Sequence, residues 1–317
     1  MPIRDVYRRQ VSLLIGVLPH VAEETCFALK GGTAINLFVR DMPRLSVDID
    51  LTYLPVASRE KSLAAVDAAM NRIAARIRKA LRGVQISTTL ALPEKAVTRL
   101  LIRHNGVQIK IEVAPVLRGC VYEPDLRAVS PAVDAAFGFA EIQVVSFADL
   151  YAGKIVAALD RQHPRDLFDV RDLMANEGID DDLRRAFIVY LVSHNRPMAE
   201  LLAPTRKPID AEFRRGFEGM TARRVTVEDL VAAREEMIAA IVGDAPRDHR
   251  RFLVSFERGE PDWARLGLPD AGELPAVQWR QRNLNMLGAE ERARLVGRLE
   301  SVLFAGGVAK RSGGGTA

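Results

Sequence analysis

Two kinds of hydrophobic pattern divide the chain near residue 178. Before it, stretches with an apolar residue at every second position predict half-buried strands, and stretches with apolar residues three or four apart predict amphipathic helices. After it, the helical period predominates. We therefore predict an α+β fold: a mixed sheet flanked by helices (residues 1–178), a mostly helical C-terminal half (179–308) and a disordered tail (309–317).

Turn and cap residues place individual elements in the first part. Asn105-Gly106 separates two alternating stretches and is typical of a two-residue β-hairpin. Ser58 is a suitable N-cap for a long helix, and Ser146 with Asp149 three residues on approaches a capping box. The predicted strands are 26–29, 46–52, 84–92, 99–104, 107–113 and 141–145, and the predicted helices are 5–18, 33–39, 58–83, 146–159 and one beginning at His163-Pro164.

Two aspartates, Asp48 and Asp50, lie two residues apart in the strand predicted for SVDIDL. Side chains two apart in a strand share a face, so Val47, Ile49 and Leu51 point the other way, towards a core. Carboxylates this close repel each other unless a cation lies between them, and Mg²⁺ is bound by one or two carboxylates together with substrate phosphates. An acidic, solvated strand face is the alternative that the spacing alone leaves open.

The glycine pair Gly31-Gly32 precedes this strand and leads into a helix that we expect to begin at Thr33. The first N–H groups of a helix attract anions, and a turn without Cβ atoms lets a phosphate approach closely. The Thr33 hydroxyl is either a phosphate contact or an N-cap. Together, the turn and the aspartates suit a nucleoside triphosphate with its Mg²⁺.

A third metal ligand is expected on a neighbouring strand, and Glu112 in VQIKIEV is the candidate. Its alternative role is that of a surface carboxylate paired with a cross-strand arginine such as Arg99 or Arg103.

Composition excludes several classes of protein. No apolar run approaches the ~20 residues of a membrane span, and Cys26 and Cys120 lack metal-ligand spacing, so a cytoplasmic protein with buried thiols is expected. The formal net charge is only +4, with 45 basic and 41 acidic residues. Arginine predominates among the basic residues, which suits phosphate binding but also follows from a GC-rich genome.

Three stretches resemble a known family. LKGGTAINLF…R.S.DIDL is similar to the AbiEii/AbiGii-type toxins of the DNA polymerase β-like nucleotidyltransferase superfamily. SFADLYAGKIVAALDRQHPRDLFDVRDL and PDWARLGLPDAGELPAVQWRQRNLNML extend the resemblance over most of residues 26–300. The second stretch matches a family motif residue by residue, through Lys154, Arg161, Arg165, Asp166 and Asp169.

The resemblance implies a toxin, encoded beside an antitoxin, that uses Mg²⁺ and a nucleoside triphosphate to transfer a nucleotide to RNA, with the tRNA 3′ end as the acceptor. It implies that Asp48 and Asp50 bind the metal. It also implies that Lys154 grips the triphosphate and that Asp166 or Asp169 acts at the nucleotide or as the base. The superfamily usually has Gly-Ser where this chain has Gly32-Thr33, and the retained hydroxyl leads us to expect the same phosphate contact. The remaining nucleotide-binding residues that it implies are Gly31, Arg161 and Arg165.

The residues of the second stretch have a structural alternative. Lys154 and Arg161 lie two helical turns apart and share a face, which would serve a triphosphate or an ion-pair network. Asp166 falls in the first turn after Pro164, where the helix dipole favours a carboxylate without any function.

Three other functions remain open on the sequence: transfer to a small molecule such as an antibiotic, transfer to a protein, and a binding module without catalysis. The arginines of the C-terminal half track an RNA backbone or belong to a mixed-charge solvated face. Restraint by the antitoxin takes place either by direct binding or by phosphorylation of a residue such as Thr33 or Ser46.

Overall fold

The computed structural model describes residues 5–221 and 223–304, which form two compact units. The first unit extends to Leu150 and also includes Glu212–Val225; the second comprises Tyr151–Ala211 and the chain from Thr226 onwards. The division falls inside helix α5 (Phe147–Arg161). The boundary predicted at residue 178 concerns folding domains and stays a prediction, and the tail predicted for 309–317 lies outside the described residues.

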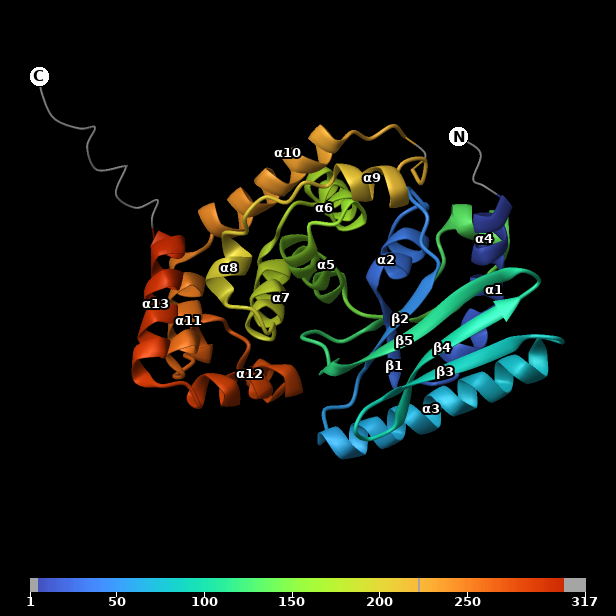
Figure 1. The fold of residues 1–317 in the computed structure, drawn as a ribbon, viewed down its shortest axis with the longest axis horizontal. Helices are drawn as coiled ribbons and strands as arrows, with labels where there is room; N and C mark the ends of the chain where they lie inside the picture. The colour runs from blue at the N-terminus through green and yellow to red at the C-terminus, as the bar shows by residue number, and fades with distance from the viewer. Residues whose placement is uncertain (1–4, 222, 305–317) are drawn as a thin grey trace, which may run out of the picture. The chain divides into compact units, whose positions relative to one another are not determined.

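A seven-stranded mixed sheet, in the order β3-β4-β5-β2-β1-β7-β6, is the centre of the first unit (Figure 1). β1 pairs with β2 antiparallel and with β7 parallel, and β2 pairs with β5 parallel. The strands are β1 (Phe27–Lys30), β2 (Asp48–Tyr53), β3 (Gln85–Ala91), β4 (Ala96–His104), β5 (Val107–Arg118), β6 (Asp125–Ala128) and β7 (Glu141–Val144).

One face of this sheet is apolar because alternate residues of each strand project from it. Leu29 and Leu51 face each other on β1 and β2, Ile49 faces Ile111 on β5, and all four are buried. Helices α1 (Asp5–Ala22) and α3 (Arg59–Ala80) pack against the sheet, α3 chiefly against β4 (Figure 1). The opposite face of β2 is left for polar side chains.

The predicted turn and caps are confirmed. Asn105 and Gly106, with φ of 48° and 75°, join β4 to β5, as a primed turn requires. The Ser58 hydroxyl accepts from Lys61 N at 3.4 Å at the start of α3. Ser146 Oγ accepts from Asp149 N, and the Asp149 carboxylate also accepts from the backbone of Val121 and Tyr122, which ties a loop to the start of α5.

Two elements of the first unit were not predicted. β6 consists of DLRA, which has no alternation, and α4 (Pro131–Phe137) is short. β6 is a strand because it pairs with β7, and its own residues carry no pattern that predicts a strand.

The second unit is an array of helices, as predicted for the C-terminal half. α6 packs on α10, and α11 packs on α7 and α13. Thr226 and Asp229 form a reciprocal capping box at α10. The helices and single helical turns from α6 onwards are α6 (Pro164–Asn176), α7 (Asp181–Val192), α8 (Met198–Leu202), α9 (Asp210–Gly216), α10 (Val227–Ile238), η2 (Ala239–Gly243), α11 (Arg247–Arg258), η3 (Trp263–Arg265), η4 (Pro269–Glu273), α12 (Pro275–Asn285) and α13 (Ala289–Phe304). No helix in the described part of the chain has the length and apolar content that crossing a membrane requires.

Candidate active site

A row of charged residues crosses the polar face of the sheet. The strand registers place Lys30 opposite Asp50, Asp50 opposite Glu112, and Glu112 opposite Arg99. Because directly opposite residues share a face, these four side chains project from the same side of four neighbouring strands. Asp48 lies on this face as well, so the prediction that the two aspartates share a face away from Ile49 and Leu51 is confirmed.

Glu112 is held by two cations. Arg99 Nη2 donates to Glu112 Oε1 at 2.6 Å, and Lys110 Nζ lies 2.8 Å from Glu112 Oε2. Although burial raises the pKa of Glu112, the hydrogen bonds from Arg99 and Lys110 outweigh it and lower the pKa overall. The pairing with Arg99 is the alternative that the sequence left open, and the role of Glu112 as a metal ligand stays a prediction.

The Asp50 carboxylate differs from Glu112 because it has no ion pair or hydrogen bond among the described residues. Burial raises its pKa, and the negative charge of Asp48 adds to the effect. Lys110 Nζ lies 3.8 Å from Asp48 Oδ2, at the long limit of an ion pair. Burial lowers the pKa of Lys30, despite the negative charge of Asp50 opposite it.

These two aspartates fit one divalent cation. Two carboxylates on one strand face, one of them without an ion pair at hydrogen-bond distance among the described residues, make an oxygen donor set of the kind that holds Mg²⁺ together with phosphate oxygens. No cluster of three or more His, Cys, Asp or Glu side chains suited to a metal occurs in the described ranges. The binding of a metal by Asp48 and Asp50 therefore stays a prediction.

The glycine turn lies directly against this pair. Gly31 has a φ of +75°, and a Cβ on it would lie 2.8 Å from Asp50 Oδ2. A Cβ on Gly32 would lie 2.7 Å from Arg44 Nη2 and 2.9 Å from Ser46 Oγ. At Gly31 the positive φ also disfavours any other residue, whereas at Gly32 a side chain would force the ends of the Arg44 and Ser46 side chains to shift. The helix α2 (Gly31–Ala34) begins two residues earlier than predicted, and it continues as a π-helical turn, η1 (Ile35–Val39).

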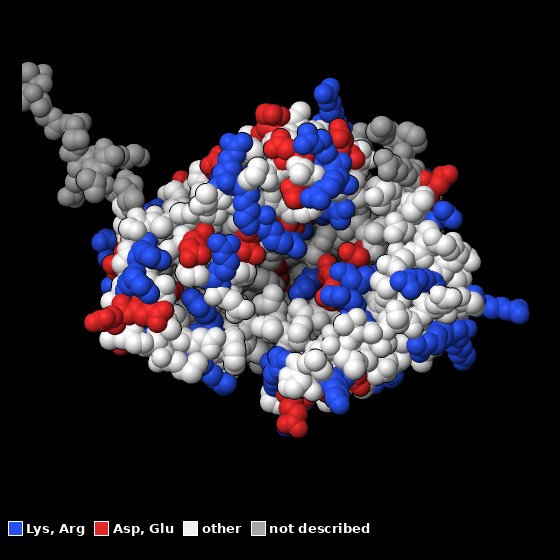
Figure 2. Space-filling model, in the orientation of Figure 1, with Lys and Arg blue, Asp and Glu red and all other residues white. Residues whose placement is uncertain are grey.

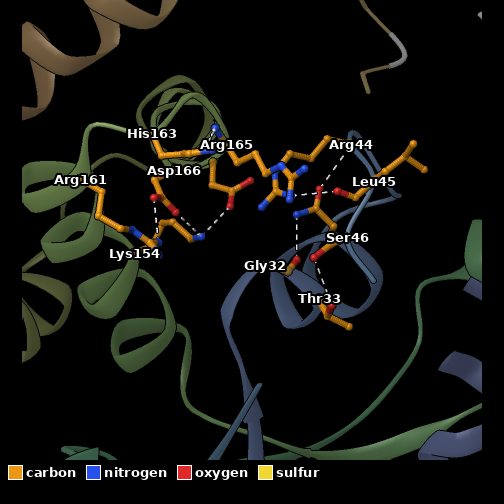
Figure 3. A network of polar contacts seen from close by, with 12 residues as sticks. Gly32, Thr33, Arg44, Leu45, Ser46, Lys154, Arg161, His163, Arg165 and Asp166 are labelled. Atoms are coloured by element: carbon orange, nitrogen blue, oxygen red, sulfur yellow. Dashed lines mark hydrogen bonds and ion pairs between the residues drawn. The ribbon is translucent and has the colours of Figure 1, made fainter. Parts of the chain in front are cut away.

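Thr33 ties the turn to β2 rather than capping a helix. Its hydroxyl is fully buried and donates to the Asp48 carbonyl at 2.5 Å. It also lies 3.1 Å from Ser46 Oγ (Figure 3). The N-cap position is Lys30, without a side-chain cap. The proposed phosphate contact of Thr33 stays a prediction, and the half-buried Ser46 places a second hydroxyl beside Gly32.

Asn36 and Arg44 stabilise the glycine turn through hydrogen bonds. Asn36 Nδ2 donates to the Gly32 carbonyl at 2.8 Å, and Asn36 Oδ1 accepts from Arg44 N at 3.2 Å. The buried Arg44 side chain donates to the Leu45 carbonyl at 3.0 Å. No role of these two residues was predicted from the sequence. Arg44 stands in the stretch that carries the family resemblance, so the motif itself contained the signal for it.

The second unit contains the other cluster of predicted residues. Lys154 Nζ lies 3.0 Å from both Asp166 Oδ1 and Asp169 Oδ2, and Arg161 Nη2 lies 2.8 Å from Asp166 Oδ2 (Figure 3). The Lys154 side chain is 8% exposed and that of Asp169 is 1% exposed, whereas Arg161 is 61% exposed. The ion-pair network that the sequence left open as an alternative is present, and the nucleotide contacts of these residues stay a prediction.

The remaining predicted residue of this cluster, Arg165, follows a histidine cap. His163 Nδ1 accepts from the backbone N of Arg165 at 3.2 Å, which makes His163 the N-cap of α6 with Pro164 in the first turn. Asp166 lies in the same first turn, where the helix dipole favours its charge.

Surface charge is mixed. Figure 2 shows Lys and Arg side chains interspersed with Asp and Glu side chains over the described residues in view, rather than gathered in a stripe of one sign. One arginine considered for RNA has a structural role, since Arg250 donates to the carbonyls of Val242, Gly243, Ala245 and Leu303.

A glycine turn packed against paired aspartates on the next strand suits nucleotide phosphates and their cation. The fold is similar to that of MenT4, a nucleotidyltransferase toxin from Mycobacterium tuberculosis H37Rv, with a TM-score of 0.54 and 18% sequence identity over 88% of this chain and 94% of that chain. The predicted fold class is confirmed.

The sequence profile described as "Nucleotidyl transferase AbiEii toxin, Type IV TA system" matches residues 12–283, and the chain belongs to this family. It is therefore a nucleotidyltransferase toxin of a toxin–antitoxin system, as the motifs indicated. The comparison with curated proteins gave no match.

Proposed function

We propose that this toxin transfers a nucleotide from a nucleoside triphosphate to an RNA acceptor in a Mg²⁺-dependent reaction, and that the acceptor is the 3′ end of tRNA. The observation that carries the proposal is the contact between the Gly31 turn and the Asp50 carboxylate, with Asp48 on the same face of β2. The residues that we propose for phosphate binding thus lie beside those that we propose for the cation, within one unit.

The chain's own groups would bind and orient the triphosphate. The first-turn N–H groups of α2 lack acceptors within the helix, and the glycines let phosphate oxygens reach them. Asp48 and Asp50 would hold Mg²⁺, which when bound withdraws electron density from the α-phosphoryl group and offsets charge on pyrophosphate. Lys30 projects a cation from the same face beside Asp50.

The reaction would proceed by attack of an acceptor hydroxyl oxygen on the α-phosphorus. The new P–O bond forms as the bond to the bridging oxygen of pyrophosphate breaks, and the hydroxyl proton passes to a carboxylate. Asp50 or Glu112 would take this proton, and the oxygens of Asp50 are the less occupied, because Arg99 Nη2 and Lys110 Nζ already lie on the two carboxylate oxygens of Glu112.

The second unit would contribute through the Lys154 cluster. The family resemblance implies that Lys154, Arg161 and Arg165 contact the nucleotide and that Asp166 or Asp169 acts beside it. The 61% exposure of Arg161 supports a contact with an external anion, whereas the enclosed ammonium of Lys154 supports a positioning role for that residue.

The proposed acceptor, the antitoxin partner and the cellular location rest on the family. Membership in a toxin–antitoxin family implies an antitoxin partner, and we place the reaction in the cytoplasm, where tRNA and nucleoside triphosphates occur. Transfer to a small molecule is the rival that shares every phosphate contact described above.

The test is to incubate the purified protein with each α-labelled nucleoside triphosphate, Mg²⁺ and total RNA, and to map the label by RNA end-sequencing. We expect label at tRNA 3′ ends, and Asp48→Asn should reduce it at least about 100-fold. Asp125→Asn, an exposed aspartate of β6 in the same sheet, is the matched control and should label at the wild-type rate.

Two results would contradict the proposal. Wild-type labelling by Asp48→Asn would remove the site assignment, and label confined to a low-mass compound or to a polypeptide in a cell extract would remove the RNA acceptor.

A further inference from the structure

The two edges of the sheet differ in how well they are protected. β3 pairs only with β4 among the described strands, and β6 pairs only with β7. An edge strand presents unpaired backbone N–H and C=O groups, and proteins usually protect such edges with short strands, charged residues or proline.

β6 carries that protection and β3 does not. β6 has four residues, two of which, Asp125 and Arg127, are charged. β3 has seven residues, QISTTLA, without a charged residue or a proline. The open edge of β3 is therefore a template on which another extended strand can pair.

The side chains of β3 are accessible as well. Helix α3 packs chiefly against β4 and leaves β3 at the margin of the sheet (Figure 1). Thr88 and Leu90 are exposed, and Leu90 is an apolar side chain that is 46% exposed. Burial of such a side chain against another strand is favourable, since it removes apolar area from water.

The residues of β3 complement themselves. When two copies run antiparallel with Thr88 at the centre, all seven residues are paired, Ile86 meets Leu90 of the second copy, and Ser87 meets Thr89. Ile86 lies opposite Ile102 of β4 on the apolar face of the sheet, whereas Thr89 lies opposite Arg99 on the polar face. The register therefore joins apolar face to apolar face and polar face to polar face, with no like charges opposed.

The match is confined to the strand itself. Residues 92–95 form the turn into β4, and residues 82–83 lie in the turn before β3, so neither segment continues the extended pairing. The contacts of this register are therefore those of Ile86 with Leu90 and of Ser87 with Thr89 of the second copy.

We propose that β3 is a self-association surface, on which a second copy of this chain pairs antiparallel about Thr88 and extends the sheet into a homodimer. The active faces of the two copies then look to the same side of a continuous sheet. A single pair of short strands supplies modest contact area, so dissociation in the micromolar range is expected.

Mass measured by sedimentation over about 1–100 µM protein tests the proposal, across the range expected for an interface of this size. The wild type should change from monomer to dimer, and Thr88→Lys should remain monomeric because two ammonium groups would face each other. Leu126→Lys, which adds a charge to an exposed apolar position of β6, should dimerise like the wild type.

Mixing two variants of opposite charge shows whether a loss of dimer is caused by misfolding of a single variant. Thr88→Lys and Thr88→Glu should each be monomeric alone and should form a mixed dimer when combined. A wild type that stays monomeric throughout, or a dimer that Thr88→Lys leaves intact, would overturn the proposal.

Oxidative cross-linking reports the register. Thr88→Cys places two thiols opposite each other, within the range that a disulfide spans, whereas Gln85→Cys places them about 20 Å apart along the strands. Disulfide-linked dimer should form with Thr88→Cys and not with Gln85→Cys or the wild type. Equal cross-linking of the two variants would contradict the Thr88-centred pairing.

Discussion

At the scale of single residues, similar side chains near β2 have different tasks because their neighbours differ. Glu112 has two cations within hydrogen-bond distance, whereas Asp50 has none and lies against Gly31. A carboxylate that already has its counter-charges stabilises the sheet, and one without them is available to an incoming cation or proton.

Lys154→Ala is expected to destabilise the protein, because it would leave Asp166 and Asp169 facing each other without the ammonium between them. Removal of one partner from a buried ion pair costs about 3–5 kcal/mol, and chemical denaturation would measure the loss. Because Lys154 is proposed to position the nucleotide, the same substitution is also expected to lower nucleotide transfer.

A double substitution separates the two effects. Lys154→Met with Asp169→Asn removes one charge of each sign and should recover part of the stability but none of the activity. A stable but inactive Lys154→Ala would show that Lys154 acts on substrate alone and that the ion pairs add nothing measurable.

Glu24 makes the free energy of unfolding depend on pH. Hydrogen bonds from Arg72, and then from Arg76, lower its pKa below the ordinary value against the effect of burial. Since the folded-state pKa is the lower one, the stabilisation is present above the unfolded-state pKa of about 4.3 and is lost as pH falls through the folded-state value.

Glu24→Gln should therefore lower the free energy of unfolding at pH 7 by about 1–3 kcal/mol and flatten its decline between neutral and acid pH. Urea denaturation at a series of pH values measures both. The exposed Glu60→Gln on α3 is the control, and a parallel decline in Glu24→Gln and wild type would refute the assignment.

At the scale of elements, the connection from β1 to α2 is built around Gly31. Its φ of +75° is unfavourable for other residues, and its missing Cβ leaves room for Asp50 Oδ2. The backbone conformation and the active-site contact therefore depend on the same atom being absent.

Gly31→Ala should lose nucleotide transfer, because the added methyl group would displace the Asp50 carboxylate. Gly83→Ala is a matched control, since Gly83 has a φ of +80° and nothing within 4 Å of the added Cβ. Both variants should lose about 1–2 kcal/mol of stability from the positive φ. Equal activity in the two variants would show that the contact with Asp50 is without consequence.

At the scale of the whole molecule, nucleotide binding should raise the melting temperature of the full chain. A ligand that binds only the native state stabilises it by about 2.7 kcal/mol at a concentration of 100 times Kd. We expect a shift with a nucleoside triphosphate and Mg²⁺, and a smaller shift both when EDTA removes the metal and when Asp48→Asn is tested with Mg²⁺. The same shift in wild type and Asp48→Asn would place the metal elsewhere.

The sequence predicted whatever depends on local periodicity. The two-residue repeat of a strand placed Asp48 and Asp50 on one face, and Asn105-Gly106 predicted the hairpin between β4 and β5. It did not predict β6, and it placed the start of α2 two residues late, because Gly31 and Gly32 are turn formers that here belong to the helix.

By itself, then, the sequence determined the fold class, the family and the kinds of side chain in the candidate site, since these follow from patterns within a few residues of one another. Only the tertiary structure decided that Lys30 lies opposite Asp50, that Arg99 forms an ion pair with Glu112, and that Ser46 lies beside Gly32. These neighbours are set by strand pairing and chain reversal between distant segments, which no local pattern encodes.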